Sequence, residues 1–257
     1  MTSASKLVDY EAMAPRYRSG RALSDEVLDR WGAAVRPHLA PLPDRAVRVA
    51  DVGAGTGIFA AAWPRWAEAT VVAVEPTPGM IAEGDPSVSY VRGRAEGLPV
   101  ASRSIDVVWV STALHHFTDQ ARAIAELDRV LDDGGRVMVR TFLPERSGMR
   151  WFAAFPGRER AMARCIGLDP LSDLLGVAGF VLHHVGEVTE RTLRFVETAD
   201  WVERMRHADS LLTALTDDEV DEGIRVLRAT PDERTTAELS LVVFERAGTG
   251  EPVPPLA

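Results

Sequence analysis

The sequence has a single cysteine, Cys165, and therefore cannot form an internal disulfide bond. One thiol and six scattered histidines give no recognisable set of metal ligands, so we expect no bound metal. No apolar run approaches the roughly 18 residues of a membrane span, and the segment 1–10 lacks the apolar core of a signal peptide. These absences predict a cytoplasmic protein that does not cross a membrane.

Positive charge is also scarce. Acidic residues outnumber basic ones by 38 to 29, and the formal net charge is −9, which disfavours a general grip on nucleic acid or anionic membrane. Asparagine is absent, so the chain lacks the Asn-Pro-Pro-Tyr type of base-flipping signature. The absence of asparagine and the presence of a single lysine, Lys6, are typical of a protein encoded by a GC-rich bacterial genome. We expect a monomer or homodimer that acts on a small molecule.

Short β-branched runs alternate with helical stretches from about residue 46 to residue 143, the pattern of stacked βαβ units. The strands are expected at 47–52, 70–75, 88–92, 105–111 and 136–142, and later at 180–185 and 237–245. The helices between them are expected at 59–67, 78–82 and 119–130, the last capped by the turn 132–135. This order predicts an α/β fold, a Rossmann-like, mostly parallel, seven-stranded sheet with helices on both faces.

Other segments are expected to surround this sheet. Residues 1–45 predict an N-terminal helical cap, with an apolar stripe formed by Leu23, Val27, Leu28, Trp31 and Val35. The main domain is expected at 46–247, with an irregular insertion at 144–175 after the fifth strand and helices at 199–205 and 217–228. We assign 144–175 and 199–230 to the acceptor pocket, and expect a flexible tail at 248–257.

A buried strand followed by glycines at alternate positions is the main sequence signal for a bound cofactor. The run from Asp51 to Gly57 lets the backbone turn sharply and approach a ligand closely. Ile58 stands where a dinucleotide-binding motif has glycine, which argues against NAD. Glu75, 18 residues beyond Gly57, ends the next strand and is able to accept hydrogen bonds from both ribose hydroxyls. The alternative for Glu75 is a helix N-cap or a solvated strand end.

These residues resemble the first motif and companion acid of class I S-adenosylmethionine (SAM) dependent methyltransferases. The resemblance is strongest to the branch with quinone-biosynthesis and natural-product enzymes, and it continues through 93–99, 106–117 and 127–137. It implies SAM as cofactor, S-adenosylhomocysteine as product and a role in bacterial specialised metabolism. The implied cofactor-binding residues are Tyr10, Tyr17, Arg21, Asp51, Gly53, Ala54, Gly55, Gly57, Glu75, Pro76, Met80, Arg94, Ala95, Glu96, Ser111 and Thr112.

One residue departs from the family pattern, which has aspartate where this chain has Arg94. Arginine cannot accept the adenine amino hydrogens, so Glu96 or a backbone carbonyl serves, or Arg94 stacks on the ring. The resemblance also implies that the segment 10–21 folds over the cofactor. Arg21 is a candidate for the methionine carboxylate and Tyr17 for the methyl channel, with a surface arginine and ordinary ring packing as the alternatives.

Methyl transfer requires alignment of the acceptor, exclusion of water and, for many acceptors, removal of a proton. His116 is the predicted base and His115 a shaping or cofactor contact, since both follow a strand at the carboxyl edge of the sheet; Tyr17 completes the predicted catalytic group. The alternative is that the pair caps a helix start with Thr118 and Asp119. His183 and His184 are interpreted as structural, with at most one ring facing inward.

The acceptor and the reaction stay open at the level of sequence. Trp151, Phe152, Phe155 and Trp201 are candidates for an apolar acceptor pocket, although such aromatics more often belong to a core or a dimer interface. The leading hypothesis is methyl transfer to an O, N or C atom of a small molecule. The alternatives are an enzyme of the same fold that uses SAM in a cyclisation or rearrangement, and a noncatalytic SAM-binding module.

Overall fold

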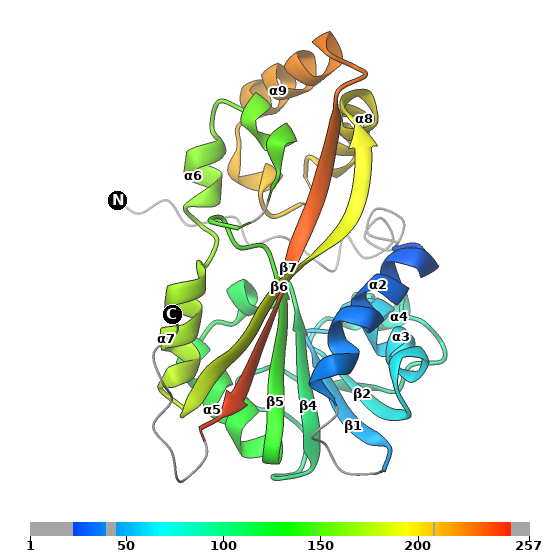
Figure 1. Ribbon diagram of the computed structural model, residues 1–257, viewed down its shortest axis with the longest axis vertical. Helices are drawn as coiled ribbons and strands as arrows, with labels where there is room; N and C mark the ends of the chain where they lie inside the picture. The colour runs from blue at the N-terminus through cyan, green and yellow to red at the C-terminus, as the bar shows by residue number, and fades with distance from the viewer. Residues whose placement is uncertain (1–22, 40–44, 147, 208, 248–257) are drawn as a thin grey trace.

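The computed structural model describes residues 23–39, 45–146, 148–207 and 209–247, and its centre is one seven-stranded sheet of order β3-β2-β1-β4-β5-β7-β6 (Figure 1). The strands are β1 (Val47–Val52), β2 (Ala69–Glu75), β3 (Tyr90–Arg92), β4 (Ile105–Ser111), β5 (Leu131–Thr141), β6 (Phe180–Arg194) and β7 (Arg234–Arg246). The α-helices are α2 (Asp25–Val35), α3 (Ile58–Trp66), α4 (Pro78–Ala82), α5 (Gln120–Val130), α6 (Arg158–Met162), α7 (Leu168–Gly176), α8 (Phe195–Met205) and α9 (Asp217–Ala229). Short 3-10 helices are η1 (Arg36–His38), η2 (Leu114–His116), η3 (Arg150–Ala154) and η4 (Leu212–Ala214).

The first five strands are parallel, and β7 enters antiparallel between β5 and β6. The expected seven-stranded, mostly parallel architecture is therefore confirmed. The strand order reverses between β1 and β4, which are neighbours in the sheet. In open α/β sheets such a reversal leaves a crevice at the carboxyl ends of the strands, where ligands bind.

Helices cover both faces of the sheet because its strands are apolar on both sides. On one face α5 and α7 pack over Val108, Val137 and Val242. On the other face α2 and α3 pack over Trp109 and Met138. The predicted stripe of α2 is confirmed, since Val27, Leu28, Trp31 and Val35 are all buried. Leu23 packs against the same cluster.

Several element boundaries differ from the predictions. Helix α5 ends at Val130 and β5 already begins at Leu131, so the turn 132–135 lies within the strand and is not a helix cap. The segment 144–175 was expected to be irregular but contains η3, α6 and most of α7. Strands β6 and β7 have 15 and 13 residues, which makes them longer than the runs at 180–185 and 237–245. The tail at 248–257 lies outside the described residues.

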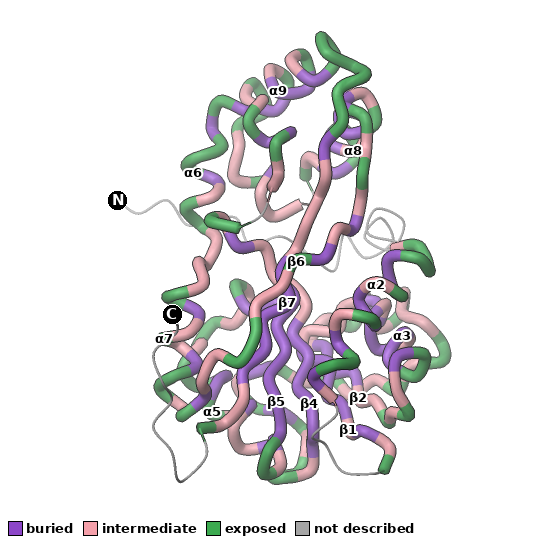
Figure 2. The backbone as a smooth tube through the Cα atoms, in the orientation of Figure 1, coloured by how far each residue is buried: buried purple, intermediate pink, exposed green. Residues whose placement is uncertain are grey.

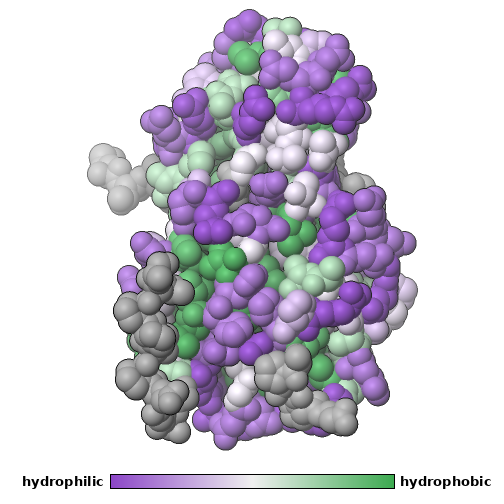
Figure 3. Space-filling model, viewed as in Figure 1, coloured by the Kyte–Doolittle hydropathy of each residue, from purple (hydrophilic) through white to green (hydrophobic). Residues whose placement is uncertain are grey.

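The extra length of β6 and β7 forms a two-stranded ribbon that carries a second lobe beyond the sheet (Figures 1 and 2). This upper lobe consists of η3, α6, α8, η4 and α9 and has its own core, which includes Phe152, Phe155, Val202 and Leu227. Gly223 allows α9 to pack closely against Phe155, because a Cβ at this position would lie 2.3 Å from the Phe155 ring. Figure 3 shows a largely hydrophilic surface over α8 and α9.

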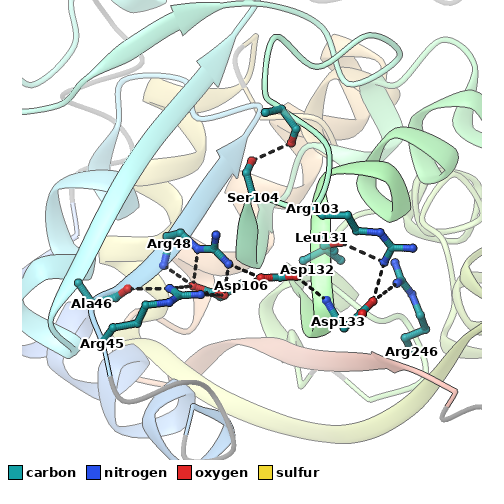
Figure 4. Close-up of polar contacts among 11 residues, drawn as sticks. Arg45, Ala46, Arg48, Arg103, Ser104, Asp106, Leu131, Asp132, Asp133 and Arg246 are labelled. Atoms are coloured by element: carbon teal, nitrogen blue, oxygen red, sulfur yellow. Dashed lines mark hydrogen bonds and ion pairs between the residues drawn. The ribbon is translucent and has the colours of Figure 1, made fainter.

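An ion-pair network joins the amino-terminal ends of the parallel strands, opposite the carboxyl ends where the crevice is expected (Figure 4). Asp106 is 2% exposed and accepts five hydrogen bonds, from the side chains of Arg45 and Arg48 and from the Arg48 amide. Arg48 also reaches Asp132 at 2.6 Å, which links β1, β4 and β5. Burial alone raises the pKa of Asp106, but the hydrogen bonds from Arg48 and Arg45 outweigh burial and hold it well below its usual range.

Three histidines meet where η1 packs against β6. A bulge between Leu182 and His184 places both His183 and His184 beside His38, with ring centroids 5.7 and 4.4 Å away. Both side chains of the pair are exposed, which agrees with the expectation that at most one ring faces inward. The bulge interrupts the alternation of facing on which that expectation was based. Burial, followed by the charges of His184, His183 and Arg136, lowers the pKa of His38 to about 4.

Mild acid is therefore expected to destabilise the fold through His38. Its pKa is lower in the folded chain than in the unfolded one, so its contribution to stability is complete above about pH 6.5 and is lost as the pH falls towards 4. Between pH 6.5 and 5 the contribution of His38 falls by about 2 kcal/mol. It is measured as the change, over this pH range, in the difference in urea-unfolding free energy between the wild type and a His38→Phe variant, because groups that titrate in both chains, Asp51 among them, then cancel. A difference that does not change with pH would contradict this assignment.

Candidate active site

A cavity of about 500 Å³ lies at the carboxyl ends of β1, β4 and β5, beneath the upper lobe. A smaller hollow of about 120 Å³ adjoins it beside β2 and the loop after β3. The two share lining residues, which are Gly53, Gly55, Ser111, Thr112 and His116. The described residues thus form one two-part crevice at the position where the strand order reverses.

The glycine loop after β1 forms the wall between the two parts. Gly53, Gly55 and Gly57 have φ values of 74°, 56° and 74°, a left-handed conformation that favours glycine. A Cβ on Gly53 would lie 2.6 Å from the Cβ of Ala113, and one on Gly57 would lie 2.2 Å from the Tyr90 hydroxyl. Gly57 lines neither part of the crevice, so its observed role is to let the chain turn against Tyr90.

Glu75 is held in a fixed orientation at the end of β2. It is 6% exposed, and its two carboxylate oxygens accept hydrogen bonds from the Gly55 and Thr77 amides at 2.8 and 2.9 Å. Each carboxylate oxygen has a second lone pair, so the group retains the capacity to accept from two hydroxyls in the smaller hollow. The bond to Thr77, the N-cap residue of α4, means that Glu75 also supports a helix start, as in the alternative interpretation.

Asp51 is a buried acceptor at the wall of the larger cavity. It is 1% exposed, and its Oδ1 has no hydrogen-bond partner among the described residues. Burial raises the pKa of Asp51 to about 7; a hydrogen bond from the Ala60 backbone opposes this shift, and the charge of Glu75 adds to it. A buried carboxylate oxygen without a donor is unfavourable, so Oδ1 favours a ligand that brings a positive charge or an N–H group close to it.

The end of β4 leads into a strained turn. Thr112 has φ = 50°, an uncommon conformation for a β-branched residue, and its amide donates to the Arg140 carbonyl at 2.8 Å. Ser111 and Thr112 line both parts of the crevice, next to Gly53. Strain of this kind persists where the surrounding structure fixes it, commonly at binding sites.

The loop after β3 encloses the smaller hollow. Arg94 is exposed and lines the hollow together with Pro76, Met80, Ala95 and Glu96. Glu96 Oε1 accepts from the Thr118 amide and hydroxyl and from the Asp119 amide. Burial opposes ionisation of Glu96, but these hydrogen bonds outweigh it and lower its pKa. One of its carboxylate oxygens is thus used to hold the start of α5.

The two adjacent histidines lie in η2 at the mouth of the crevice. Their ring centroids are 3.8 Å apart, and both residues line the larger cavity. The N-cap of α5 is Asp119, whose side chain accepts from the Arg122 amide at 3.0 Å. The histidines therefore do not supply the helix cap of the alternative interpretation. His116 also lines the smaller hollow and so faces both parts of the crevice.

The predicted aromatic residues divide between two positions. Phe152 and Phe155 belong only to the core of the upper lobe, whereas Trp151 and Trp201 pack with this core and also line the larger cavity. Tyr10, Tyr17 and Arg21 were also predicted to contribute to the site. They lie outside the described residues.

Two charged residues of the cavity floor, Arg140 and Glu190, were missed by the sequence predictions. Arg140 is 7% exposed near the end of β5, and Glu190 is 9% exposed in β6. They form an ion pair of 2.5 Å and both line the larger cavity. The sequence offers one signal for this pair: Arg140 directly follows the apolar run 137–139 of a central strand. A charge in such a strand is costly unless it is paired, so an acidic partner was to be expected.

Residues 50–139, which extend from β1 into β5, match the family model described as "Methyltransferase domain". A malonyl-[acyl-carrier protein] O-methyltransferase of Methylococcus capsulatus is 36% identical over 145 residues, covering 52% of this chain and 50% of that protein. A demethylmenaquinone methyltransferase of Renibacterium salmoninarum is 32% identical over 137 residues, covering 52% of this chain and 56% of that protein. The chain thus spans about half the length of these two relatives.

The fold is also similar to that of solved structures. A candidate methyltransferase from an antibiotic biosynthesis pathway of Anabaena variabilis superposes with a TM-score of 0.64 at 22% sequence identity. The superposition covers 83% of this chain and 96% of that one, so it extends beyond the matched domain to most of the described architecture. At this identity the likeness concerns the fold alone.

Proposed function

We propose that this chain, which contains a class I methyltransferase domain with SAM as its cofactor, methylates an O, N or C atom of a small-molecule acceptor in bacterial specialised metabolism. When bound, SAM supplies an electrophilic methyl group attached to a positively charged sulfur. The observation that carries the proposal is the two-part crevice, in which a hollow lined by Glu75 and the glycine loop adjoins a larger and more apolar cavity. A methyl donor and an acceptor need such adjacent spaces.

The residues around the smaller hollow fit the cofactor. Glu75 is oriented by two backbone amides and retains lone pairs for the ribose hydroxyls. Gly53 and Gly55 allow the main chain to approach without a side chain in between. Asp51, whose Oδ1 has no described partner, suits a positively charged group near the larger cavity. The cofactor-binding roles given to Arg94, Ala95, Glu96, Ser111 and Thr112 rest on their positions around the same hollow.

His116 is the proposed base, because it is the histidine that faces both the donor and acceptor parts of the crevice. It accepts the proton that the acceptor loses, and His115 beside it shapes the cavity mouth. The upper lobe covers the cavity, and limiting the access of water to a bound acceptor favours transfer over side reactions. Tyr17 and Arg21 remain proposed contributors from the N-terminal segment.

A His116→Gln variant is expected to lower the methylation rate about 10²–10³-fold while leaving SAM affinity within a factor of about two. The measurement follows formation of methylated product by mass spectrometry, with a panel of phenols, amines and activated methylene compounds as acceptors. The matched control is His207→Gln, which changes an exposed histidine outside the crevice and should keep the full rate. Equal rates in the two variants would remove His116 from the mechanism.

The same experiment tests the reaction itself. A product whose mass increases by one methyl group supports transfer. An isomer of the acceptor, formed with SAM unconsumed, would instead support cyclisation or rearrangement. Absence of SAM binding in isothermal titration calorimetry would reject the proposed function as a whole.

A further inference from the structure

The floor of the larger cavity contains a carboxylate whose orientation is fixed from one side. Glu190 Oε1 accepts three hydrogen bonds, from Trp31 Nε1 at 2.8 Å and from Arg140 Nε and Nη2 at 2.8 and 2.5 Å. No described residue donates to the second oxygen, Oε2. Because Glu190 lines the cavity, this second oxygen is the part of the carboxylate left for a ligand.

Arg140 is itself immobilised. Its Nη1 donates to the Ser111 hydroxyl at 3.1 Å, and its guanidinium lies 5.0 and 5.3 Å from the ring centres of Phe59 and Trp31. These contacts combine hydrogen bonds with cation–π attraction. The pair therefore presents one hydrogen-bond acceptor at a defined place, without the freedom of a surface side chain.

The charges in this pair decide which ligand group it suits. Arg140 neutralises Glu190, so the pair has no net charge to attract an ammonium group. An anionic carboxylate or phosphate would lie against Oε2 and be repelled. A neutral O–H group satisfies the exposed lone pairs and adds no charge to the cavity.

Arg164, Arg191, Asp209 and Glu238 also line the larger cavity, but most of its exposed lining is apolar and favours an apolar ligand body. Apolar side chains from both lobes line it, and they include Phe59, Phe142, Met149, Trp151 and Leu211. A volume of about 500 Å³ is within the range of small-molecule sites, with space for a fused-ring compound.

We propose that the acceptor is a hydrophobic alcohol or phenol whose hydroxyl group donates a hydrogen bond to Glu190 Oε2. This inference rests on the proposed function and names the substrate class of the same site. Glu190 is thereby a specificity-determining residue, held in place by Arg140 and Trp31.

The test compares naphthol with its methyl ether, which has the same rings but no O–H, by isothermal titration calorimetry of the full chain. The wild type should bind naphthol about 10-fold more tightly than the ether. In Glu190→Gln the amide oxygen keeps the bonds to Trp31 and Arg140, so the amide N–H₂ faces the cavity as a donor. The preference for naphthol should then fall to about 2-fold or less.

The matched control is Glu238→Gln, which removes a negative charge from the same cavity but lies outside the Arg140 pair. It should retain the wild-type preference. An unchanged preference in Glu190→Gln, an equal loss in Glu238→Gln, or no binding of naphthol to the wild type at millimolar concentration would overturn the inference. Parallel titration with S-adenosylhomocysteine separates the two claims, since a chain that binds it but ignores the hydroxyl refutes only the substrate class.

Discussion

Replacement of Glu75 by alanine is expected to weaken SAM binding at least about 100-fold. The change removes an oriented carboxylate that is 6% exposed and that, under the proposed function, accepts two charge-assisted hydrogen bonds from the ribose, each worth roughly 1.5–3 kcal/mol. It also frees the Gly55 and Thr77 amides, so the glycine loop loses one of its supports. The affinities are measured by isothermal titration calorimetry with SAM and S-adenosylhomocysteine.

The control for this experiment is Glu68→Gln, an exposed residue just before β2, which should bind SAM as the wild type does. Thermal unfolding of both variants shows whether Glu75→Ala is still folded at the titration temperature. A folded Glu75→Ala variant with wild-type affinity would show that the ribose is not held at this position. The assignment of the smaller hollow to the nucleoside would then be wrong.

Replacement of Asp106 by asparagine is expected to destabilise the fold by about 3 kcal/mol, as measured by urea unfolding at neutral pH. Asparagine retains the shape of the side chain but cannot neutralise Arg45 and Arg48 or accept five hydrogen bonds. The two arginine side chains are 39% and 33% exposed, so water recovers part of the loss. For this reason we expect a loss of unfolding free energy at the lower end of what is found when one partner of a buried ion pair is removed.

A matched comparison is available at the same edge of the sheet. Asp133 is 93% exposed and pairs with Arg103 at 3.1 Å, so Asp133→Asn should change the free energy of unfolding by less than about 1 kcal/mol. Similar losses in the two variants would mean that burial does not set the strength of the Asp106 network. Catalysis should be unaffected in Asp133→Asn, because this edge is opposite the crevice.

The half of the fold that contains β1 to β5 was predictable from the sequence because its signals are local. The buried run 47–52, the glycines at 53, 55 and 57 and the acid at 75 each lie within one βα unit, and both strand limits of β1 and β4 agree with the prediction. The upper lobe was less predictable. Much of β6 and β7 lies beyond the sheet core and is only partly buried, so these segments lack a continuous apolar run.

The cavity floor was unpredictable for a different reason. Arg140 and Glu190 are 50 positions apart, and nothing in either neighbourhood indicates the other. Their pairing depends on a register shift in β6 between Thr189 and Arg191, a feature set by the tertiary structure. The adjacent histidines were found because they follow β4 closely in the sequence. Only the structure shows that Asp119, and not the histidines, caps the start of α5.

The β6–β7 ribbon has a consequence for how this molecule is able to diversify. The roof of the larger cavity is carried by two strands and is stabilised by its own set of buried side chains, whereas the smaller hollow lies at the ends of the first four strands. Substitutions between residues 195 and 233 can therefore reshape the roof without disturbing the smaller hollow. Under the proposed function, new substrates become accessible by remodelling one module while the donor's surroundings stay intact.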